Sequence, residues 1–267
     1  MDRYHVKPGS KLRLSSIDPD DTSLIDGGKK AGEAVLRKLG ERLGELQDLL
    51  YAGREHKLLI ILQGMDTAGK DGTIRKVFQN IDPLGVRAVP FRAPSEEELD
   101  RDFLWRIHRH VPAKGEVVIF NRSHYEDVLV ARVKELVPKK IWKARYAQIN
   151  GFEQLLAETG TTIVKFFLHI DRDEQRDRLQ ARIDDETKRW KFRKGDLDDR
   201  KLWDEYEKAY EEALSRTSTK WAPWYVVPAN AKWYRNVIVA QVLVDKLEAL
   251  DLQAPEAADD IDGVEVE

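Results

Sequence analysis

The chain has 267 residues, of which 42% are hydrophobic and 35% are charged, so it can form one large domain or two small ones around a substantial core. It has no cysteine, which excludes disulfides, thiolate metal sites and cysteine nucleophiles, and it has no apolar run of the ~18 residues that a membrane-spanning helix needs. The net charge is −3, yet residues 253–267 hold six acids and no base, so the rest of the chain carries only +3 and is poorly suited to general nucleic-acid binding.

The first 55 residues are expected to form an irregular extension and one helix. Residues 1–30 are polar and rich in Gly, Pro and Asp, which indicates a segment that wraps the surface. Leucines then recur at helical spacing over 31–52, which predicts an amphipathic helix. The N-terminus lacks the apolar segment of a secretory signal, and together with the absence of cysteine this leads us to expect a cytoplasmic protein.

The most informative segment is an apolar strand at 57–63 that runs directly into the turn Gly64-Met-Asp-Thr-Ala-Gly-Lys70-Asp-Gly72. An apolar strand, a glycine-containing turn, a lysine and then a helix, here expected over 70–80, build a phosphate-binding loop. The glycines let the backbone approach an anion closely, and the lysine adds a positive charge. The strict pattern has Ser or Thr after the lysine, where this chain has Asp71. The residues of the turn that are expected to bind phosphate or nucleotide are Gly64, Met65, Thr67, Ala68, Gly69, Asp71 and Gly72.

Asp66 lies inside this turn, where its carboxylate would repel a bound phosphate unless a cation lay between them. Mg²⁺ prefers oxygen ligands and often bridges carboxylates to phosphates. We therefore expect Asp66 to anchor a metal ion in place of the missing loop hydroxyl. The alternative is a turn aspartate that only bonds its own backbone.

A second polar segment follows a later strand. The pattern predicts a short strand at 86–91, a helix over 95–110 that opens with a capping box, and a buried strand at 116–120. This last strand leads into Asn121-Arg-Ser-His-Tyr-Glu-Asp127. Ligands of parallel sheets bind beyond the carboxyl ends of the strands, so this segment should face the phosphate-binding loop.

Three side chains of this segment are candidate site residues. Arg122 is expected to clamp phosphate oxygens, because a guanidinium can bond two of them at once. Asn121 and Glu126 are expected to contact the phosphates or the nucleotide, and Glu126 also to share the metal with Asp66. The alternative for Glu126 is a structural capping box with Ser123.

The middle of the chain is helical and highly charged. Helices are expected over 124–135 and 139–158, before the longest strand at 161–170. The charged helical region at about 173–216 contains Lys188-Arg-Trp-Lys-Phe-Arg-Lys194, in which five of seven residues are basic. We interpret this region as a mobile lid that brings positive charge over a polyanion. The alternatives are a solvated charged face and, for the basic cluster, a nucleic-acid patch with stacking aromatics.

A last strand at 224–227 and a last helix over 233–250 complete the predicted elements, and residues 253–267 are expected to be an acidic, disordered tail. Short apolar strands that alternate with helices predict an α/β fold with a central parallel sheet covered on both faces. We expect a single domain over 1–252, which includes the N-terminal extension and helix at 1–55 and the lid.

Several groups of residues together resemble the polyphosphate kinase 2 family. The resemblance implies a three-layer P-loop kinase fold similar to thymidylate kinase, with a helical lid. It implies that Asp66 and Lys70 are essential, that Arg122 clamps phosphate and that Mg²⁺ is the cofactor. The lid residues implied to grip polyphosphate are Arg178, Arg182, Lys188, Arg189 and Lys191. The segments that carry the resemblance are the turn at 64–72, Phe120-Asn-Arg-Ser-His-Tyr-Glu-Asp127, Lys188-Arg-Trp-Lys-Phe192 with Gly195-Asp-Leu197, and Ala222-Pro-Trp-Tyr225 with Pro228-Ala-Asn230.

Members of the family move terminal phosphate reversibly between inorganic polyphosphate and nucleotides, so the resemblance implies polyphosphate, AMP, ADP and ATP as partners. Many members have Asp at the position of Asn121 and Asn at the position of Glu126. The pair found here resembles the class III subgroup, which phosphorylates both AMP and ADP. We expect direct in-line transfer without a covalent enzyme intermediate.

Two other functions stay open at this point. One is an ATP-dependent nucleotide or nucleoside kinase on the same fold, and the other is a non-enzymatic binder of RNA or polyphosphate through 188–194. Exposed aromatic residues and the N-terminal helix also favour a homo-oligomer.

Overall fold

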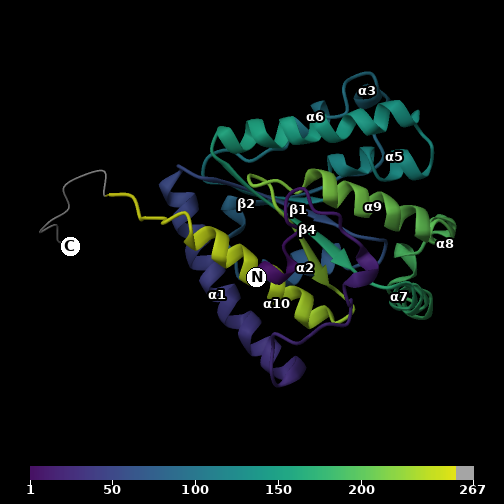
Figure 1. Ribbon diagram of the computed structural model, residues 1–267. Coiled ribbons are helices and arrows are strands. Elements are labelled where there is room, and N and C mark those ends of the chain that lie inside the picture. The colour runs from purple at the N-terminus through teal and green to yellow at the C-terminus, as the bar shows by residue number, and fades with distance from the viewer. Residues whose placement is uncertain (257–267) are drawn as a thin grey trace, which may run out of the picture.

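The computed structural model describes residues 1–256 (Figure 1). Its centre is a sheet of five parallel strands in the order β2-β3-β1-β4-β5. The predicted α/β class with a central parallel sheet is therefore confirmed. The strands are β1 (Lys57–Gln63), β2 (Val86–Pro90), β3 (Val117–Asn121), β4 (Thr161–His169) and β5 (Trp224–Pro228).

Helices cover both faces of this sheet (Figure 1). On one face, α1 and α10 pack side by side and α2 packs against α10. On the other face lie α5, α6 and α9, and α7 and α8 lie beyond one end of the sheet. The helices are α1 (Gly28–Gly53), α2 (Lys70–Val77), α3 (Glu96–Leu99), α4 (Trp105–His108), α5 (Val130–Val133), α6 (Lys139–Glu158), α7 (Arg172–Asp184), α8 (Lys194–Lys201), α9 (Trp203–Thr217) and α10 (Lys232–Glu248).

The central strand β1 is buried on both faces, as a strand between two helical layers must be. Its Ile60 pairs with Ile119 of β3 on one side and with Val164 of β4 on the other, and Ile60 is fully buried. The apolar run needs no polar alternation here, because neither face meets water. This burial fixes the carboxyl end of β1, and therefore the start of the phosphate-binding loop, in the middle of the sheet edge.

The N-terminal extension lies along the outer edge of β5. His5 forms an antiparallel bridge with Tyr225, and the N–H of Val6 donates to the carbonyl of Trp224 at 2.9 Å. The extension contains only short 3-10 turns at Asp2–Tyr4 and Leu14–Ser16, as expected for an irregular segment. Within residues 1–256, no helix is long and apolar enough to span a membrane. The predicted acidic tail falls largely on residues 257–267, outside the described part of the chain.

Two of the predicted helices are wrong in extent. In place of the predicted helix over 95–110, the structure has two short helices, α3 and α4. The helix is interrupted because the side chain of Asp102 accepts a hydrogen bond from the N–H of Leu104 and starts a new turn before α4. The capping box at Ser95 is confirmed. The predicted helix over 124–135 is a 3-10 turn (His124–Asp127) followed by α5.

The lid region and the helix after the loop also differ from the prediction. The charged region at 173–216 is three separate helices, and the first ends where Asp185 accepts hydrogen bonds from both the N–H and the hydroxyl of Thr187. The helix expected over 70–80 ends at Val77.

Candidate active site

The turn between β1 and α2 has the backbone geometry of a phosphate-binding loop. Gly64 has φ +156° and Gly69 has φ +101°, conformations in which a side chain would be strained. A Cβ on Gly64 would lie 2.8 Å from the carbonyl oxygen of Leu168, so this position is also too crowded for any larger residue. Thr67 also has a positive φ, +63°, so three residues of the turn adopt left-handed backbone conformations.

The start of α2 presents free amide groups at the end of this turn. The N–H of Thr73 donates to the carbonyl of Gly69 at 2.9 Å, and this is the first hydrogen bond of the helix. The N–H groups of Lys70, Asp71 and Gly72 come before it and have no carbonyl one turn earlier to accept from them. Such amides, together with the helix dipole, form an anion-binding site.

The side chain of Lys70 folds back over the turn. Its Nζ donates to the carbonyls of Gly64 at 2.8 Å and Met65 at 3.3 Å. Burial, and secondly the charge of Arg122, lower the pKa of Lys70 from 10.5 to about 8, against the opposing effect of nearby carboxylates. The carboxylates that act on Lys70 are those of Asp66, Glu126 and Asp71.

The structure brings the two predicted halves of the site together at the start of α2. Asn121 donates to Asp71 Oδ1 at 2.7 Å, which ties the end of β3 to the start of α2. Asp71, which stands where the strict pattern has Ser or Thr, therefore holds the neighbouring strand end.

Arg122 and Glu126 lie on the same side of the sheet. Arg122 adopts φ +63°, and its Nη1 lies 3.4 Å from Glu126 Oε2. Ser123 does cap this segment, because its hydroxyl accepts from the N–H of Tyr125. Glu126 bonds to Arg122 instead of the Ser123 backbone, so the proposed capping box with Ser123 is not formed.

Asp66 is ion-paired to the lid helix. Its Oδ2 lies 3.2 Å from Nη1 of Arg182 on α7, and its carbonyl accepts from Gln175 Nε2 at 3.2 Å. The hydroxyl of the adjacent Thr67 is buried and has no hydrogen-bond partner in residues 1–256. A carboxylate and a free hydroxyl thus lie next to each other in the turn.

This donor set fits Mg²⁺, which takes oxygen ligands and is usually held by one or two carboxylates together with substrate phosphates. No group of three or more His, Cys, Asp or Glu side chains in residues 1–256 is arranged to hold a metal ion without help. A divalent ion would therefore depend on phosphate oxygens for the rest of its ligands, which suits a site that assembles with substrate.

Arg178 has a different environment from the one expected for a lid residue. It is buried, and its Nη1 donates to the carbonyls of Thr67 at 2.9 Å and Ala68 at 3.1 Å. Its Nη2 donates to the carbonyls of Ala229 and Asn230, and its Nε bonds Glu174. With its donors engaged, Arg178 holds the outside of the turn.

The remaining lid residues lie at the surface and pair locally. Lys188 forms an ion pair with Asp185, and Arg189 lies 3.5 Å from Glu186. Lys191 lies 5.1 Å from the ring centre of Trp190, whose side chain is 76% exposed. These cations are not in contact with the turn.

The sequence analysis missed several residues that support the site. Gln175 bonds the turn, and Arg235 of α10 donates to the carbonyl of Ala68 at 3.0 Å. Lys232 lies close enough to Arg178, Arg235 and Lys188 that their charges help burial to lower its pKa. The only sequence feature that pointed to this part of the site was the motif Pro228-Ala-Asn230, which directly precedes α10.

A buried polar network supports the segment that carries Arg122. Lys165 of β4 donates to Glu153 Oε2 at 2.5 Å and to the hydroxyl of Tyr125 at 2.8 Å, and all three side chains are fully buried. His124 Nε2 lies 3.2 Å from Glu153 Oε1. The two residues just before Glu126 are thereby anchored to α6 and β4.

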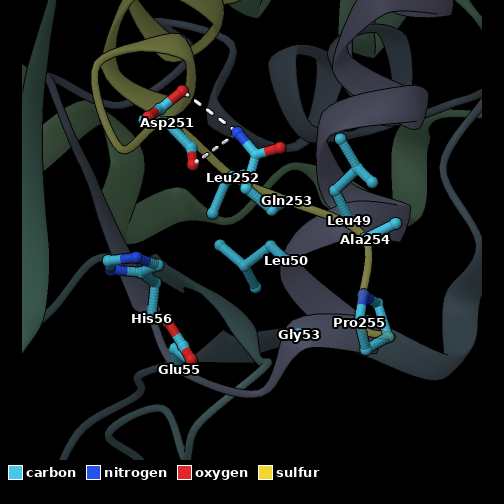
Figure 2. A pocket seen from close by; sticks show the side chains of 10 residues that line it. All are labelled: Leu49, Leu50, Gly53, Glu55, His56, Asp251, Leu252, Gln253, Ala254 and Pro255. Atoms are coloured by element: carbon cyan, nitrogen blue, oxygen red, sulfur yellow. Dashed lines mark hydrogen bonds between the residues drawn. The ribbon is translucent and has the colours of Figure 1, made fainter. Parts of the chain in front are cut away.

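A surface pocket lies at the opposite end of the sheet. It is formed by the end of α1 and the chain segment after α10, where Gln253 Nε2 bonds the carbonyl and carboxylate of Asp251 at 3.2 Å (Figure 2). Glu55 and His56, which precede β1, line it. It is therefore at the amino ends of the strands, away from the phosphate-binding loop.

A parallel α/β sheet, a glycine-containing loop with a buried lysine after its central strand, and an arginine directly after the neighbouring strand define a P-loop protein of the phosphotransferase type. The family model described as polyphosphate kinase 2 matches residues 27–255. The chain belongs to the polyphosphate kinase 2 family.

Individual relatives agree with this assignment. The chain is 58% identical to an AMP/ADP-polyphosphate phosphotransferase of Meiothermus ruber, over 96% of each chain. It is 44% identical to an ADP-polyphosphate phosphotransferase of Rhodopseudomonas palustris, over 95% of this chain and 92% of the other. The crystal structure of polyphosphate kinase 2 from Arthrobacter aurescens superposes with a TM-score of 0.94 at 47% identity, over 98% of this chain and 93% of the other.

Proposed function

We propose that this protein transfers the terminal phosphate of inorganic polyphosphate to AMP and ADP, reversibly and by direct in-line displacement. The family membership and the activities for which its relatives are named support the donor and the acceptors. The single structural observation that carries the proposal is the buried Lys70 between the turn, Arg122 and three carboxylates. An ATP-dependent kinase or a non-enzymatic binder is not favoured by the family.

The residues of the site have distinct roles in this proposal. Lys70 and the free amides of α2 hold phosphates at the point of transfer. Arg122 neutralises charge that develops on the transferred phosphoryl group. Arg182, Lys188, Arg189 and Lys191 bring further positive charge to the polyphosphate chain, and Arg178 is reassigned as a residue that positions the turn.

Asp66, with Glu126, would hold Mg²⁺, which when bound neutralises phosphate charge and orients the transferring group. Nucleotide contacts are assigned to Asn121 and Asp71, since the hydrogen bond between them lies at the edge of the site. The cytoplasmic location, the homo-oligomer and the absence of nucleic-acid binding remain predictions.

The test is a transfer assay without ATP as donor. Purified protein is incubated with long-chain polyphosphate and Mg²⁺, and with AMP or ADP as separate acceptors. We expect ADP from AMP and ATP from ADP, and no product when the metal is chelated. Lys70→Ala and Asp66→Asn should each reduce transfer by several orders of magnitude while the protein stays folded. Failure to form either product would rule out polyphosphate as donor, and near-normal turnover of either variant would remove the site assignment.

A further inference from the structure

Arg235 is a buried cation without a counter-ion. It lies on α10 with 2% of its surface exposed, and its Nη1 donates to the carbonyl of Ala68 at 3.0 Å. Its Nε and Nη2 both donate to Oδ1 of Asn236, at 3.1 and 2.9 Å. Within residues 1–256 no carboxylate lies in ion-pairing distance of this guanidinium, so both of its acceptors are neutral.

The guanidinium lies directly behind the phosphate-binding loop. A Cβ built on Gly69 would lie only 2.0 Å from Nη1 of Arg235, and one on Gly72 would lie 3.6 Å from Nη2. These two glycines are the N-cap of α2 and a residue of its first turn. Arg235 therefore touches the outer side of the backbone whose inner side offers amides to an anion.

The hydrogen bond to Ala68 also fixes the direction of a peptide group. The C=O and N–H of a trans peptide point in opposite directions, so a carbonyl of Ala68 held outward turns the N–H of Gly69 toward the site. Arg178 donates to the same carbonyl at 3.1 Å from the lid helix. Two arginines from distant elements thus converge on one carbonyl oxygen.

An uncompensated charge at this position acts on a bound anion. Burial, and secondly the charge of Arg178, lower the pKa of Arg235 to about 9, which agrees with a desolvated cation that has no anionic partner. Buried charges are normally paired, because an unpaired one is expensive to desolvate. A phosphate in the turn would be the missing partner, at short range and through little solvent.

We propose that Arg235 is a positioning residue for polyphosphate: it orients the amide of Gly69 and leaves its own charge unpaired so that phosphate bound in the loop completes the ion pair. This inference rests on the proposed function, because it takes the loop as the polyphosphate site. It explains why Gly69 must lack a side chain, and it assigns a role to α10, which is not part of the lid.

The decisive variant is Asn236→Asp, which keeps the shape and both acceptor contacts but gives Arg235 a carboxylate partner. If the unpaired charge serves the phosphate, the Kd for inorganic tripolyphosphate, measured by calorimetry in Mg²⁺ without nucleotide, should rise about tenfold. The KM for polyphosphate should rise in parallel, with the KM for ADP unchanged and the melting temperature equal or higher. Gln241→Glu, on the same helix, is the control, since it adds the same charge next to exposed Asp245.

Arg235→Lys tests the orienting role separately. It keeps the charge but loses the planar group that reaches both Ala68 and Asn236. We expect kcat to fall at least tenfold, with a smaller change in the Kd for tripolyphosphate than in Asn236→Asp. This variant leaves Asn236 unchanged, so it tests the orienting role even if Asn236→Asp is unstable.

An unchanged Kd for tripolyphosphate in folded Asn236→Asp, or a tenfold rise in the Gln241→Glu control, would overturn the charge argument. A native kcat in Arg235→Lys would overturn the orienting role. The titration requires no turnover. A wild-type protein that binds tripolyphosphate but transfers no phosphate would contradict the proposed function, and the shift in Kd between wild type and Asn236→Asp would still decide the role of Arg235.

Discussion

Nη1 of Arg182 lies 3.2 Å from Oδ2 of Asp66, which ion-pairs the lid helix α7 to the phosphate-binding loop. The same guanidinium atom lies 3.9 Å from Oδ2 of Asp196 on α8. Arg182 therefore occupies the cation position beside Asp66, where we propose that Mg²⁺ binds. A metal ion bound at Asp66 would therefore compete with the lid arginine for one carboxylate, and its binding would free Arg182 for the phosphate chain.

This competition makes a prediction for Arg182→Gln. We expect the affinity of the ligand-free protein for Mg²⁺, measured by calorimetry, to rise several-fold, because the carboxylate loses its resident cation. We also expect polyphosphate-dependent turnover to fall at least tenfold, because a charge clamp on the phosphates is lost. Arg176→Gln is the control, since Arg176 is an exposed arginine of the same helix that pairs with Asp173 and Asp177. Weaker Mg²⁺ binding in Arg182→Gln would contradict the competition.

The lowered pKa of Lys70 predicts an alkaline limit on activity. Its ammonium form, to which we assign phosphate binding, dominates below a pKa of about 8 and is lost above it. We expect kcat/KM for polyphosphate to fall about tenfold per pH unit above that value, and Lys70→Arg to shift this limb to higher pH if it retains activity. A flat profile between pH 7 and 10 would show that Lys70 does not titrate there.

The effect of the same group on stability has the opposite sign. Because its pKa is lower in the folded protein than its ordinary 10.5, unfolding takes up a proton between about pH 8 and 10.5. The contribution of Lys70 to the free energy of unfolding therefore rises with pH in that window. The free energy of unfolding, from urea denaturation, and kcat/KM should be measured over the same pH range. A fall in kcat/KM without a fall in the free energy of unfolding would separate titration of the site from alkaline unfolding.

Gly69→Ala should inactivate the site. The new Cβ would collide with Arg235, and a residue with φ +101° is strained by any side chain. We expect at least a hundredfold loss of transfer, with a lower melting temperature. Gly151→Ala on α6 is the matched control, because nothing lies within 4 Å of its Cβ and alanine favours a helix. It should leave transfer unchanged and raise the free energy of unfolding by about 0.5–1 kcal/mol.

The buried pair of Lys165 and Glu153 should show strong coupling in a double-mutant cycle. Lys165→Met leaves Glu153 buried without a cation, and we expect it to lower the free energy of unfolding by about 3–5 kcal/mol. Glu153→Gln, which leaves the Lys165 cation unpaired, should lower the free energy of unfolding by a comparable amount. The double variant should cost much less than the sum, because no uncompensated charge remains. Additive effects in urea denaturation would show that the two groups do not stabilise each other.

Several features of this protein were available from the sequence alone. Both ends of each of the five strands were predicted within one residue, because most of the strands are runs of predominantly apolar residues. The loop at 64–72 was recognisable because its glycines, its lysine and the preceding strand are contiguous. Helix ends were less accurate, since single side chains such as Asp102 and Asp185 decide them through local hydrogen bonds.

The tertiary structure alone decided which arginines hold the loop. Arg178 and Arg235 bond main-chain carbonyls of Thr67 and Ala68 that lie 111 and 167 residues away in the chain. Every residue has a carbonyl, so no residue type in the sequence marks such an acceptor. The sequence determines the loop through contiguous residue types, whereas the partner of a buried guanidinium is set by which helices the folded sheet brings behind that loop.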